Sequence, residues 1–462
     1  MADRTHVGFL GIAEAAAALA GGELSSLTLT DALLVRIERL NPTLNAYTCV
    51  MADSARTDAR ASDARINSGE RRGPLDGIPI AIKDVIDTAG VVTTYGSIKY
   101  RDHRPAADAH VVQQLRQAGA VILGKTNTHE LARGITTDNP HFGPTRNPWD
   151  LTRHPGGSSG GSGAAVATGL AVGALGTDTG GSVRIPSHMT GITGLKPTHG
   201  LVGRTGARPL VRNFDHIGPM TRSAADCALM LEGMAGPDPN DPDAIAQPAG
   251  SFAAALNDPI GGYRAGIIQD FADDALPRIR ELFAEAVQAI RSLDVRIDSW
   301  TLPATLDPKA AQLVSRSEGY VSIHEMFDGN FSSIDPSIHQ RLNAGADATA
   351  FDYLRGLEAR TAIEAAVSDA LESRDFLLSP AYPYPAEPIK RFDARANDTL
   401  HASFFNASHH PALVVPMGFA DGLPVGLQIV GRLHDDATVL QIGHAFQQVT
   451  THHRQRPDFP VQ

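Results

Sequence analysis

GGSSGGSGAAVATGLAVGALGTDTGGSVRIPSHMTGITGLKPTHG, residues 156–200, is the most unusual stretch of this 462-residue chain. Two clusters of glycine and serine flank an apolar segment of alanine and glycine. Glycine lets backbone N–H groups approach a ligand, because it has no Cβ, and the serines add hydroxyls at fixed backbone positions. The apolar middle, residues 163–175, predicts a buried, closely packed helix that is too short to span a bilayer.

Three interpretations of the two clusters compete. A phosphate-binding loop is disfavoured, because G-x-x-x-x-G-K-[ST] is absent and neither cluster contains lysine. A structural role, with glycines in turns and serines as caps, would explain a lone GGSSGG better. The third interpretation is a nucleophile with an oxyanion hole, because Ser182 follows Gly180 and Gly181 on a tight turn. The N–H groups from Thr179 to Ser182 would then converge on a developing negative charge.

Outward from this stretch, strands alternate with helices. Ile78 to Asp84 is a short apolar run between turn residues, typical of a buried strand. Further strands are predicted at 120–123, 263–268, 295–300, 375–378, 412–415 and 425–430, and helices at 30–40, 52–66, 108–118, 277–293 and 437–448. Thr30 and Asp31 are expected to cap the first helix, with Pro42 following its end. The alternation predicts an α/β fold with a mixed β-sheet core sandwiched by helices.

The sequence predicts a short N-terminal segment followed by one large domain. Residues 1–72 predict an N-terminal helical segment packed on the core, and residues 73–462 form the main domain. Residues 304–360 lack a clean strand pattern and predict a helical insertion in that domain. Long insertions of this kind are often functional, so we expect this one to act as a lid or a specificity element.

Composition narrows the function classes. The net charge of -11 argues against nucleic acid as a partner, because phosphate binding needs clustered lysine and arginine. Two distant cysteines and an N-terminus without signal-peptide features predict a cytoplasmic protein with no membrane partner. The 18 histidines include no H-E-x-x-H or comparable spacing, so we expect neither a metal nor an organic cofactor.

Several blocks surround the two clusters in order. They are GIPIAIKD (77–84), GKTNTHELARG (124–134), NPHFGPTRNPWD (139–150), FDHIGPM (214–220) and PVGLQIVG (424–431). Together with the 24-residue spacing of Ser158 and Ser182, they resemble the amidase signature family over about residues 75–457. The resemblance implies that residues 73–462 adopt the amidase signature fold.

The resemblance also implies a Ser-Ser-Lys triad. Lys83 would be the base, Ser158, in a cis peptide, the proton relay, and Ser182 the nucleophile. Ser159 would help by hydrogen bonding, and Ser162 would be structural. Asp178 and Arg184 bracket the nucleophile loop, and we expect a partly buried ion pair there, because an unpaired buried arginine is costly.

The chemistry requires a neutral lysine. A serine hydroxyl is a poor nucleophile until a neighbour takes its proton, and no histidine lies in a G-x-S-x-G elbow. An exposed lysine is charged at pH 7, whereas burial lowers its pKa. Lys83 ends an apolar strand, where such burial is expected. Without the Gly-Ser clusters, a pairing of Lys83 with Asp84 or Asp87 would be the better explanation.

These residues predict an amidohydrolase that cleaves C–N bonds through an acyl-serine intermediate. One alternative is the glutamine-hydrolysing component of a tRNA-dependent amidotransferase, which resembles the same family. That component carries a glutamine-binding acid, whereas the matching position here is near Thr399, so the chain is more similar to a stand-alone amidase. His409 also replaces a glycine usual in the adjacent block. The other alternative, a catalytically silent binding protein, is disfavoured because all three triad residues are present.

Substrate choice depends on the pocket. By resemblance, the loop after Lys125 lines it with four small or apolar residues, Leu131, Ala132, Ile135 and Phe142, while Arg133 is expected to face solvent. An apolar cleft selects apolar ligands, so aryl amides and aryl carbamates (urethanes) are the expected substrates. Aromatic residues of the insertion either close over a ring-bearing substrate or pack the insertion onto the core. Homodimers are common in the family, so a homodimer is expected.

Overall fold

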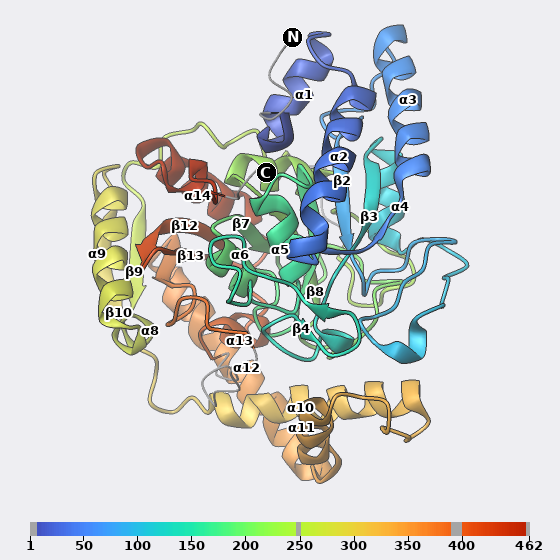
Figure 1. The fold of residues 1–462 in the computed structure, drawn as a ribbon. Helices are drawn as coiled ribbons and strands as arrows, with labels where there is room; N and C mark the ends of the chain where they lie inside the picture. The colour runs from blue at the N-terminus through green and yellow to red at the C-terminus, as the bar shows by residue number, and fades with distance from the viewer. Residues whose placement is uncertain (1–6, 246–250, 390–399, 459–462) are drawn as a thin grey trace.

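The computed structural model describes residues 7–245, 251–389 and 400–458. An 11-stranded mixed sheet runs through the molecule, and helices pack around it (Figure 1). Every residue of the central strands β2, β6 and β8 except one is at least nine-tenths buried, so both faces of the sheet are covered. The predicted α/β fold, a mixed sheet sandwiched by helices, is confirmed.

The strands lie in an order that differs from their order in the chain. Across the sheet they are β1 (Tyr47–Val50), β3 (Val121–Thr126), β2 (Pro79–Lys83), β6 (Gly173–Asp178), β8 (His216–Thr221), β7 (Thr193–Lys196), β12 (Ala412–Ala420), β13 (Leu423–Gly431), β11 (Phe376–Pro380), β9 (Arg264–Ile268) and β10 (Arg296–Trp300). The pairs β3–β2, β2–β6, β11–β9 and β9–β10 are parallel, and the others are antiparallel. A separate two-stranded ribbon joins β4 (Asp138–Asn139) to β5 (Gly143–Pro144).

Helices connect most of these strands. They are α1 (Ile12–Ala20), α2 (Ser26–Leu44), α3 (Ala52–Ser68), α4 (His110–Gln117), α5 (Gly160–Ala167), α6 (Arg184–Thr190), α7 (Ala224–Glu232), α8 (Gln269–Asp274), α9 (Pro277–Arg291), α10 (Pro308–Phe327), α11 (Pro336–Ala346), α12 (Ala350–Glu372), α13 (Leu400–Ala407) and α14 (Asp436–Val449). Short 3-10 helices cover Val7–Phe9, Ile98–Tyr100, Glu130–Ala132 and His452–Arg454.

The parallel pair of β2 and β6 positions the site. Ile80, Ala81 and Ile82 of β2 lie opposite Gly173, Ala174 and Leu175 of β6. Both strands therefore end at the same edge of the sheet. Lys83 closes β2 at that edge, and the turn after Asp178 leads from β6 into α6.

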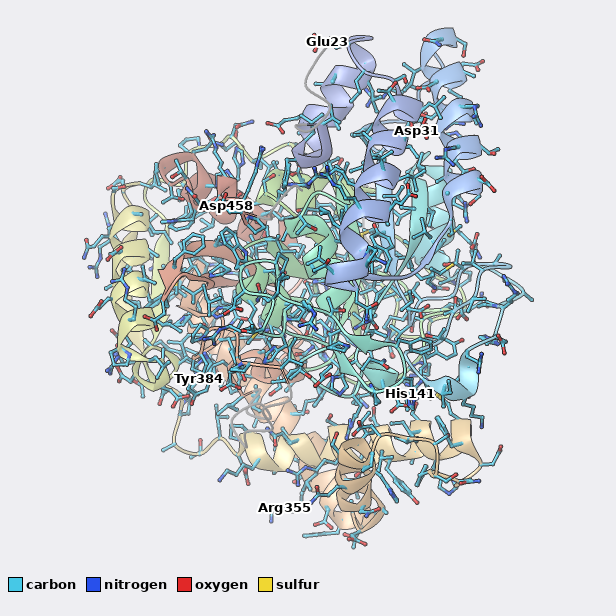
Figure 2. The ribbon with its side chains drawn as sticks, viewed as in Figure 1. Glu23, Asp31, His141, Arg355, Tyr384 and Asp458 are labelled. Atoms are coloured by element: carbon cyan, nitrogen blue, oxygen red, sulfur yellow. The ribbon has the colours of Figure 1, made fainter. Side chains whose placement is uncertain are left out.

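The predicted insertion is helical. Helices α10, α11 and α12 join the edge strand β10 to β11, and α12 continues to Glu372, beyond the expected boundary. In Figure 1 they extend below the sheet, opposite α1 to α3. Glu23, which follows α1, and Arg355, on α12, mark these two ends in Figure 2. Whether the insertion moves as a lid stays a prediction.

Two predicted helices are wrong in their extent. Helix α2 begins at Ser26, because the Ser25 hydroxyl accepts the Thr28 N–H at 3.0 Å as its cap, and Pro42 lies inside its last turn. Residues 163–175 do not form one helix: α5 ends at Ala167, Gly169 turns the chain at φ +67°, and the rest enters β6. The alanines and glycines suited both a close-packed helix and a fully buried strand, so pattern alone did not separate them.

The N-terminal segment is not wholly helical. Strand β1 lies within residues 1–72 and pairs antiparallel with β3, which places it at one edge of the sheet. The boundary at residue 72 stays a prediction. In the described ranges, no helix is long and apolar enough to cross a membrane.

Candidate active site

Lys83 is fully buried at the end of β2. Its Nζ lies 2.7 Å from Ser158 Oγ and 2.7 Å from Thr177 Oγ1. Burial lowers the pKa of Lys83 to about 7, because desolvation disfavours the ammonium more than the charges of Asp178 and Asp215 favour it. A substantial fraction of the amine is therefore neutral near pH 7, and its lone pair is available to accept a proton from Ser158.

Ser158 lies two residues before α5, next to the N-cap residue Ser159. The Gly157–Ser158 peptide bond is cis, and the Ser158 carbonyl accepts from the His129 N–H at 3.2 Å. A Cβ on Gly157 would lie 2.7–2.8 Å from backbone atoms of residues 135–137, so only glycine fits there. The first Gly-Ser cluster thus packs its backbone directly against the loop at 135–137.

Ser182 lies on the turn between β6 and α6, and 6% of its surface is exposed. Its carbonyl accepts from the Ser159 N–H at 3.3 Å, which holds the two Gly-Ser clusters together. Gly181, just before it, has φ +108°, and a Cβ there would lie 2.5 Å from Ala402 Cβ. The turn therefore requires glycine both for its backbone angle and for space.

The predicted ion pair between Asp178 and Arg184 is present and completely buried. Arg184 Nε and Nη2 donate to the two Asp178 oxygens at 3.0 and 2.9 Å, and Asn406 Nδ2 donates to Oδ1 at 2.9 Å. Burial alone would raise the pKa of Asp178, but the Arg184 charge and these hydrogen bonds hold it well below its usual range. The carboxylate thereby fixes the start of the turn.

One of the N–H groups predicted for the oxyanion hole is already used within the protein. The Gly181 N–H donates to Asp178 Oδ1 at 2.8 Å and so does not point to a substrate. In the described part of the chain, the N–H groups of Gly180 and Ser182 donate to no protein acceptor, and both residues line a cleft. Thr179 lines it too, and its hydroxyl donates to Asp215 at 2.6 Å. The glycine spacing alone could not show that Asp178 takes one of these donors.

The remaining serines of the first cluster support the site. Ser159 Oγ lies 3.3 Å from both the carbonyl and the N–H of Thr177. Ser162 Oγ donates to the Leu175 carbonyl at 2.9 Å and lies 2.7 Å from Thr126 Oγ1. Both serines fasten α5 to the strands that carry the site.

The cleft over Ser182 has a volume of about 550 Å³. Its walls come from four segments: the 132–135 loop, the 179–182 turn, the stretch 210–214, and helices α10 to α13. Ala132 and Ile135 line it as predicted, and Arg133 lines it as well rather than facing solvent. Leu131 and Phe142 do not. Leu131 is fully buried in the core, and Phe142 lies beside β5, where its carbonyl accepts from Asn45.

The aromatic residues of the insertion do not line this cleft. Phe327 packs edge-on against Tyr100 with ring centroids 6.2 Å apart. Tyr320, His324 and Phe331 pack against one another, and Tyr353 donates to Glu318 at 2.8 Å. Of the two roles considered for them, the contacts favour packing.

Sequence reasoning missed Thr177, Asp215 and Asn406. Thr177 holds Lys83, Asp215 holds Thr179, and Asn406 holds Asp178. Thr177 lies on a strand whose first residues are predicted as helix, which hides its position. Asp215 lies within the FDHIGPM block, but nothing in its sequence neighbours shows the long-range contact. Among the described residues, no group of three or more His, Cys, Asp or Glu side chains is arranged to hold a metal ion.

Comparisons with known proteins agree with this architecture. The Amidase family model matches residues 28–440. A protein of Roseiflexus sp. (strain RS-1), named as the A subunit of a glutamyl-tRNA(Gln) amidotransferase, is 39% identical over 98% of this chain and 99% of its own length.

Solved structures are similar to this chain over nearly its whole length. One chain, from a vestigial protein complex that reveals the evolutionary origins of an s-triazine catabolic enzyme, has a TM-score of 0.91 at 32% identity, covering 97% of this chain and 100% of its own. A bacterial aryl acylamidase of the amidase signature enzymes has a TM-score of 0.90 at 26% identity, covering 98% of this chain and 99% of its own. With the family model spanning most of its length, the chain belongs to the amidase signature family.

Proposed function

We propose that this protein hydrolyses the C–N bond of small amides through a covalent acyl-serine intermediate, with Lys83, Ser158 and Ser182 as the triad. The observation that carries the proposal is the 2.7 Å contact between Lys83 Nζ and Ser158 Oγ, made by two fully buried side chains. A backbone hydrogen bond from the Ser159 N–H to the Ser182 carbonyl holds Ser182 beside this pair, and Ser182 lines the cleft. A buried neutral lysine next to two serines suits nucleophile activation.

The proposed cycle balances its protons along this chain of groups. As Ser182 Oγ forms a bond to the amide carbon, its proton passes to Ser158 Oγ while the Ser158 proton passes to Lys83 Nζ. Collapse of the tetrahedral intermediate breaks the C–N bond, and the proton returns along the same route to the leaving amine. Water then attacks the acyl-serine with the same relay, releasing a carboxylic acid and restoring the Ser182 hydroxyl.

The oxyanion donors would be the N–H groups of Gly180 and Ser182, with Thr179 beside them. These residues line the cleft on a turn held by Asp178, so the donors need no rearrangement as negative charge develops. Preorganised donors of this kind commonly contribute about 10²–10³ in rate each.

Covalent labelling tests the nucleophile without knowledge of the substrate. A fluorophosphonate probe should label the wild-type protein, and Ser182→Ala should abolish labelling. Ser54→Ala, on the exposed side of α3, is the matched control and should label normally. Labelling of Ser182→Ala at the wild-type rate would refute the assignment, and an unreactive wild-type protein would favour the silent binding alternative.

For the substrate, we propose a small amide that carries a carboxylate, with glutamine as the first candidate. Arg133 and Arg316 are the charged residues among the described lining of the cleft, and no Asp or Glu is among them. Arg133 Nη1 donates to the Ser315 carbonyl on the same wall at 3.4 Å. Guanidinium groups suit carboxylate recognition. The similarity to proteins named as A subunits of an amidotransferase supports the same choice and suggests partner subunits. The position that matches the glutamine-binding acid of that component lies near Thr399, and it falls outside the described residues.

Aryl amides and aryl carbamates are the second candidate. The cleft also has an apolar side, formed by Ile135, Leu210, Phe214 and Phe404, which suits a ring. The similarity to an aryl acylamidase supports this reading. A carbamate differs from an amide by one oxygen beside the carbonyl, so the same donors would serve both.

A parallel assay separates the two. Glutamine, 4-nitroacetanilide, a 4-nitrophenyl carbamate and a short aliphatic amide should be compared at one enzyme concentration. We expect glutamine to be preferred, and Arg316→Gln to raise its KM at least about tenfold with little change in kcat. Arg278→Gln, on the exposed side of α9, is the control. A preference for the aryl substrates that is insensitive to Arg316→Gln would select the second candidate.

A further inference from the structure

The stretch 210–215, which leads into β8, contributes to both the wall of the cleft and its catalytic turn. Leu210 and Phe214 line the cleft. Asp215 follows them immediately, next to His216, which pairs with Asp178 across β8 and β6. This places the Asp215 carboxylate beside the turn that carries Ser182.

Three donors converge on this carboxylate. Thr179 Oγ1 donates to Oδ1 at 2.6 Å. The N–H groups of Leu210 and Val211 donate to Oδ2 at 2.8 and 2.9 Å. An ionised carboxylate only accepts hydrogen bonds, so the Thr179 hydroxyl must donate, which fixes its orientation. One side chain therefore joins the cleft wall to the oxyanion turn.

The same stretch is anchored on its other side. The Asn213 N–H donates to Glu318 Oε2 at 3.1 Å, and Glu318 also accepts from Tyr353 at 2.8 Å. The Asn213 carbonyl accepts from His409 Nε2 at 2.8 Å. Helices α10 and α12 and the segment after α13 thus hold the loop, so Asp215 positions Thr179 relative to a fixed wall.

We propose that Asp215 is a positioning residue for the acylation step, which holds Thr179, and with it the oxyanion turn, in register with the cleft wall. The proposal rests on the proposed function. Asp178 still holds the turn through the Gly181 N–H and Arg184. Without the Asp215 contact, however, Thr179 and the Gly180 N–H that follows it are free to shift relative to a substrate seated against Leu210 and Phe214. Misplacement of reacting groups by about 1 Å is enough to slow an enzymatic step about a hundredfold, whereas binding to the wall would be largely retained.

Fluorophosphonate labelling of Ser182 tests this, because its phosphonyl oxygen occupies the oxyanion position. The variants are Thr179→Val, which removes the donor at nearly constant volume, and Thr179→Ser, which keeps it. Thr450→Val is the control, since Thr450 Oγ1 donates to the Phe446 carbonyl at 2.8 Å at the end of α14. We expect Thr179→Val to lower the limiting labelling rate at least about tenfold with an unchanged half-saturating probe concentration. Thr179→Ser should restore most of the rate.

The comparison belongs at a pH on the plateau of the labelling profile, where loss of the Asp215 charge no longer changes the protonation of Lys83. There Asp215→Ala should match Thr179→Val, and the double variant should be no slower than either single variant. Asp215→Ala also leaves the N–H groups of Leu210 and Val211 without their acceptor, so the folding of this variant must be checked by thermal unfolding. If Asp215→Ala does not fold, the result for Thr179→Val decides whether the proposal holds. A Thr179→Val rate equal to that of Thr450→Val would overturn the proposal. That result is distinct from failure of the proposed function, in which Ser182→Ala would still be labelled.

Discussion

At the scale of single residues, the site depends on a lysine kept away from water. Lys83 is fully buried and its ammonium is opposed by desolvation, while its hydroxyl neighbours Ser158 and Thr177 offer hydrogen bonds without charge. Asp178, the carboxylate that most favours the ammonium, is already committed to Arg184. The proposed base is therefore neutral in a substantial fraction at a pH where an exposed lysine is charged.

The rate of Ser182 labelling should follow the neutral fraction of Lys83. We expect the rate to rise with pH to a plateau, with a midpoint near the Lys83 pKa of about 7. Lys83→Arg should not restore the activity lost in Lys83→Ala, because a guanidinium cannot be deprotonated. The measurement is the labelling rate from about pH 5.5 to about pH 9, which brackets that pKa. A profile that is flat over this range, or an active Arg variant, would contradict a neutral base.

The same shift makes stability depend on pH. The native state releases the Lys83 proton near pH 7, whereas the unfolded chain keeps it until the ordinary lysine value of 10.5. Between these values the unfolded chain holds one more proton, so raising the pH favours the native state. Relative to Lys83→Met, the wild-type protein should gain about 1.4 kcal/mol of unfolding free energy per pH unit from about pH 7 to about pH 10. Denaturant unfolding at several pH values measures this, and a constant difference would contradict it.

At the scale of elements, the turn between β6 and α6 is held by its own ion pair. Asp178 ends β6, Arg184 begins α6, and their contact closes the turn that presents Ser182. Arg184 also donates to Gln428 on β13 and to Asn406 on α13, at 2.9 and 2.7 Å. Three groups from separate elements, Asp178, Gln428 and Asn406, therefore meet on one guanidinium.

Removing Arg184 should be costly, because it leaves a buried carboxylate without its counter-charge. We expect Arg184→Met to lower the free energy of unfolding by about 3–5 kcal/mol and to slow Ser182 labelling. Arg278→Met breaks an exposed ion pair with Glu281 and should change stability little. Chemical denaturation of both variants is the measurement. Equal stability of the two would show that Asp178 does not need Arg184.

Elements whose hydrophobic pattern suits only a helix or only a strand were predictable from the sequence. A stretch whose pattern suits both was not. The helix at Ala52–Ser68 and the strand at Pro79–Lys83 were expected close to their observed bounds. Gly163 to Leu175 suited helix and strand equally, and Gly169 decided the outcome through a positive φ that composition does not reveal. In the site, Gly180 and Gly181 indicated Ser182 as a candidate nucleophile, and the resemblance to the family supplied the roles expected of Ser158 and Lys83. The contacts of Thr177 and Asp215 depend on strand order, which sequence neighbours do not encode.

At the scale of the whole molecule, the chain itself shows its family, but it does not show its oligomeric state or its location in the cell. The homodimer and the cytoplasmic location stay predictions, because one chain's fold determines neither. Cofactor need, by contrast, is open to a direct test on the purified protein.

Activity should survive removal of metals. The proposed relay moves protons among Ser182, Ser158 and Lys83 only, and the described residues present no metal-holding cluster of three or more ligating side chains. After exhaustive dialysis against EDTA, the labelling rate and amide turnover should equal those of untreated protein. A loss that zinc restores would show that a metal takes part.

The order of strands separates the proposed proton relay from the α10–α12 insertion. Lys83 and the turn after β6 are neighbours through β2–β6 pairing, near one side of the sheet, whereas the α10–α12 insertion is carried between β10 and β11, at the other. Lengthening or exchanging those helices changes what enters the cleft without altering the register of the pair that holds the base. We therefore expect the amide substrates of related chains to change through this one insertion during evolution, while the proposed proton relay is conserved.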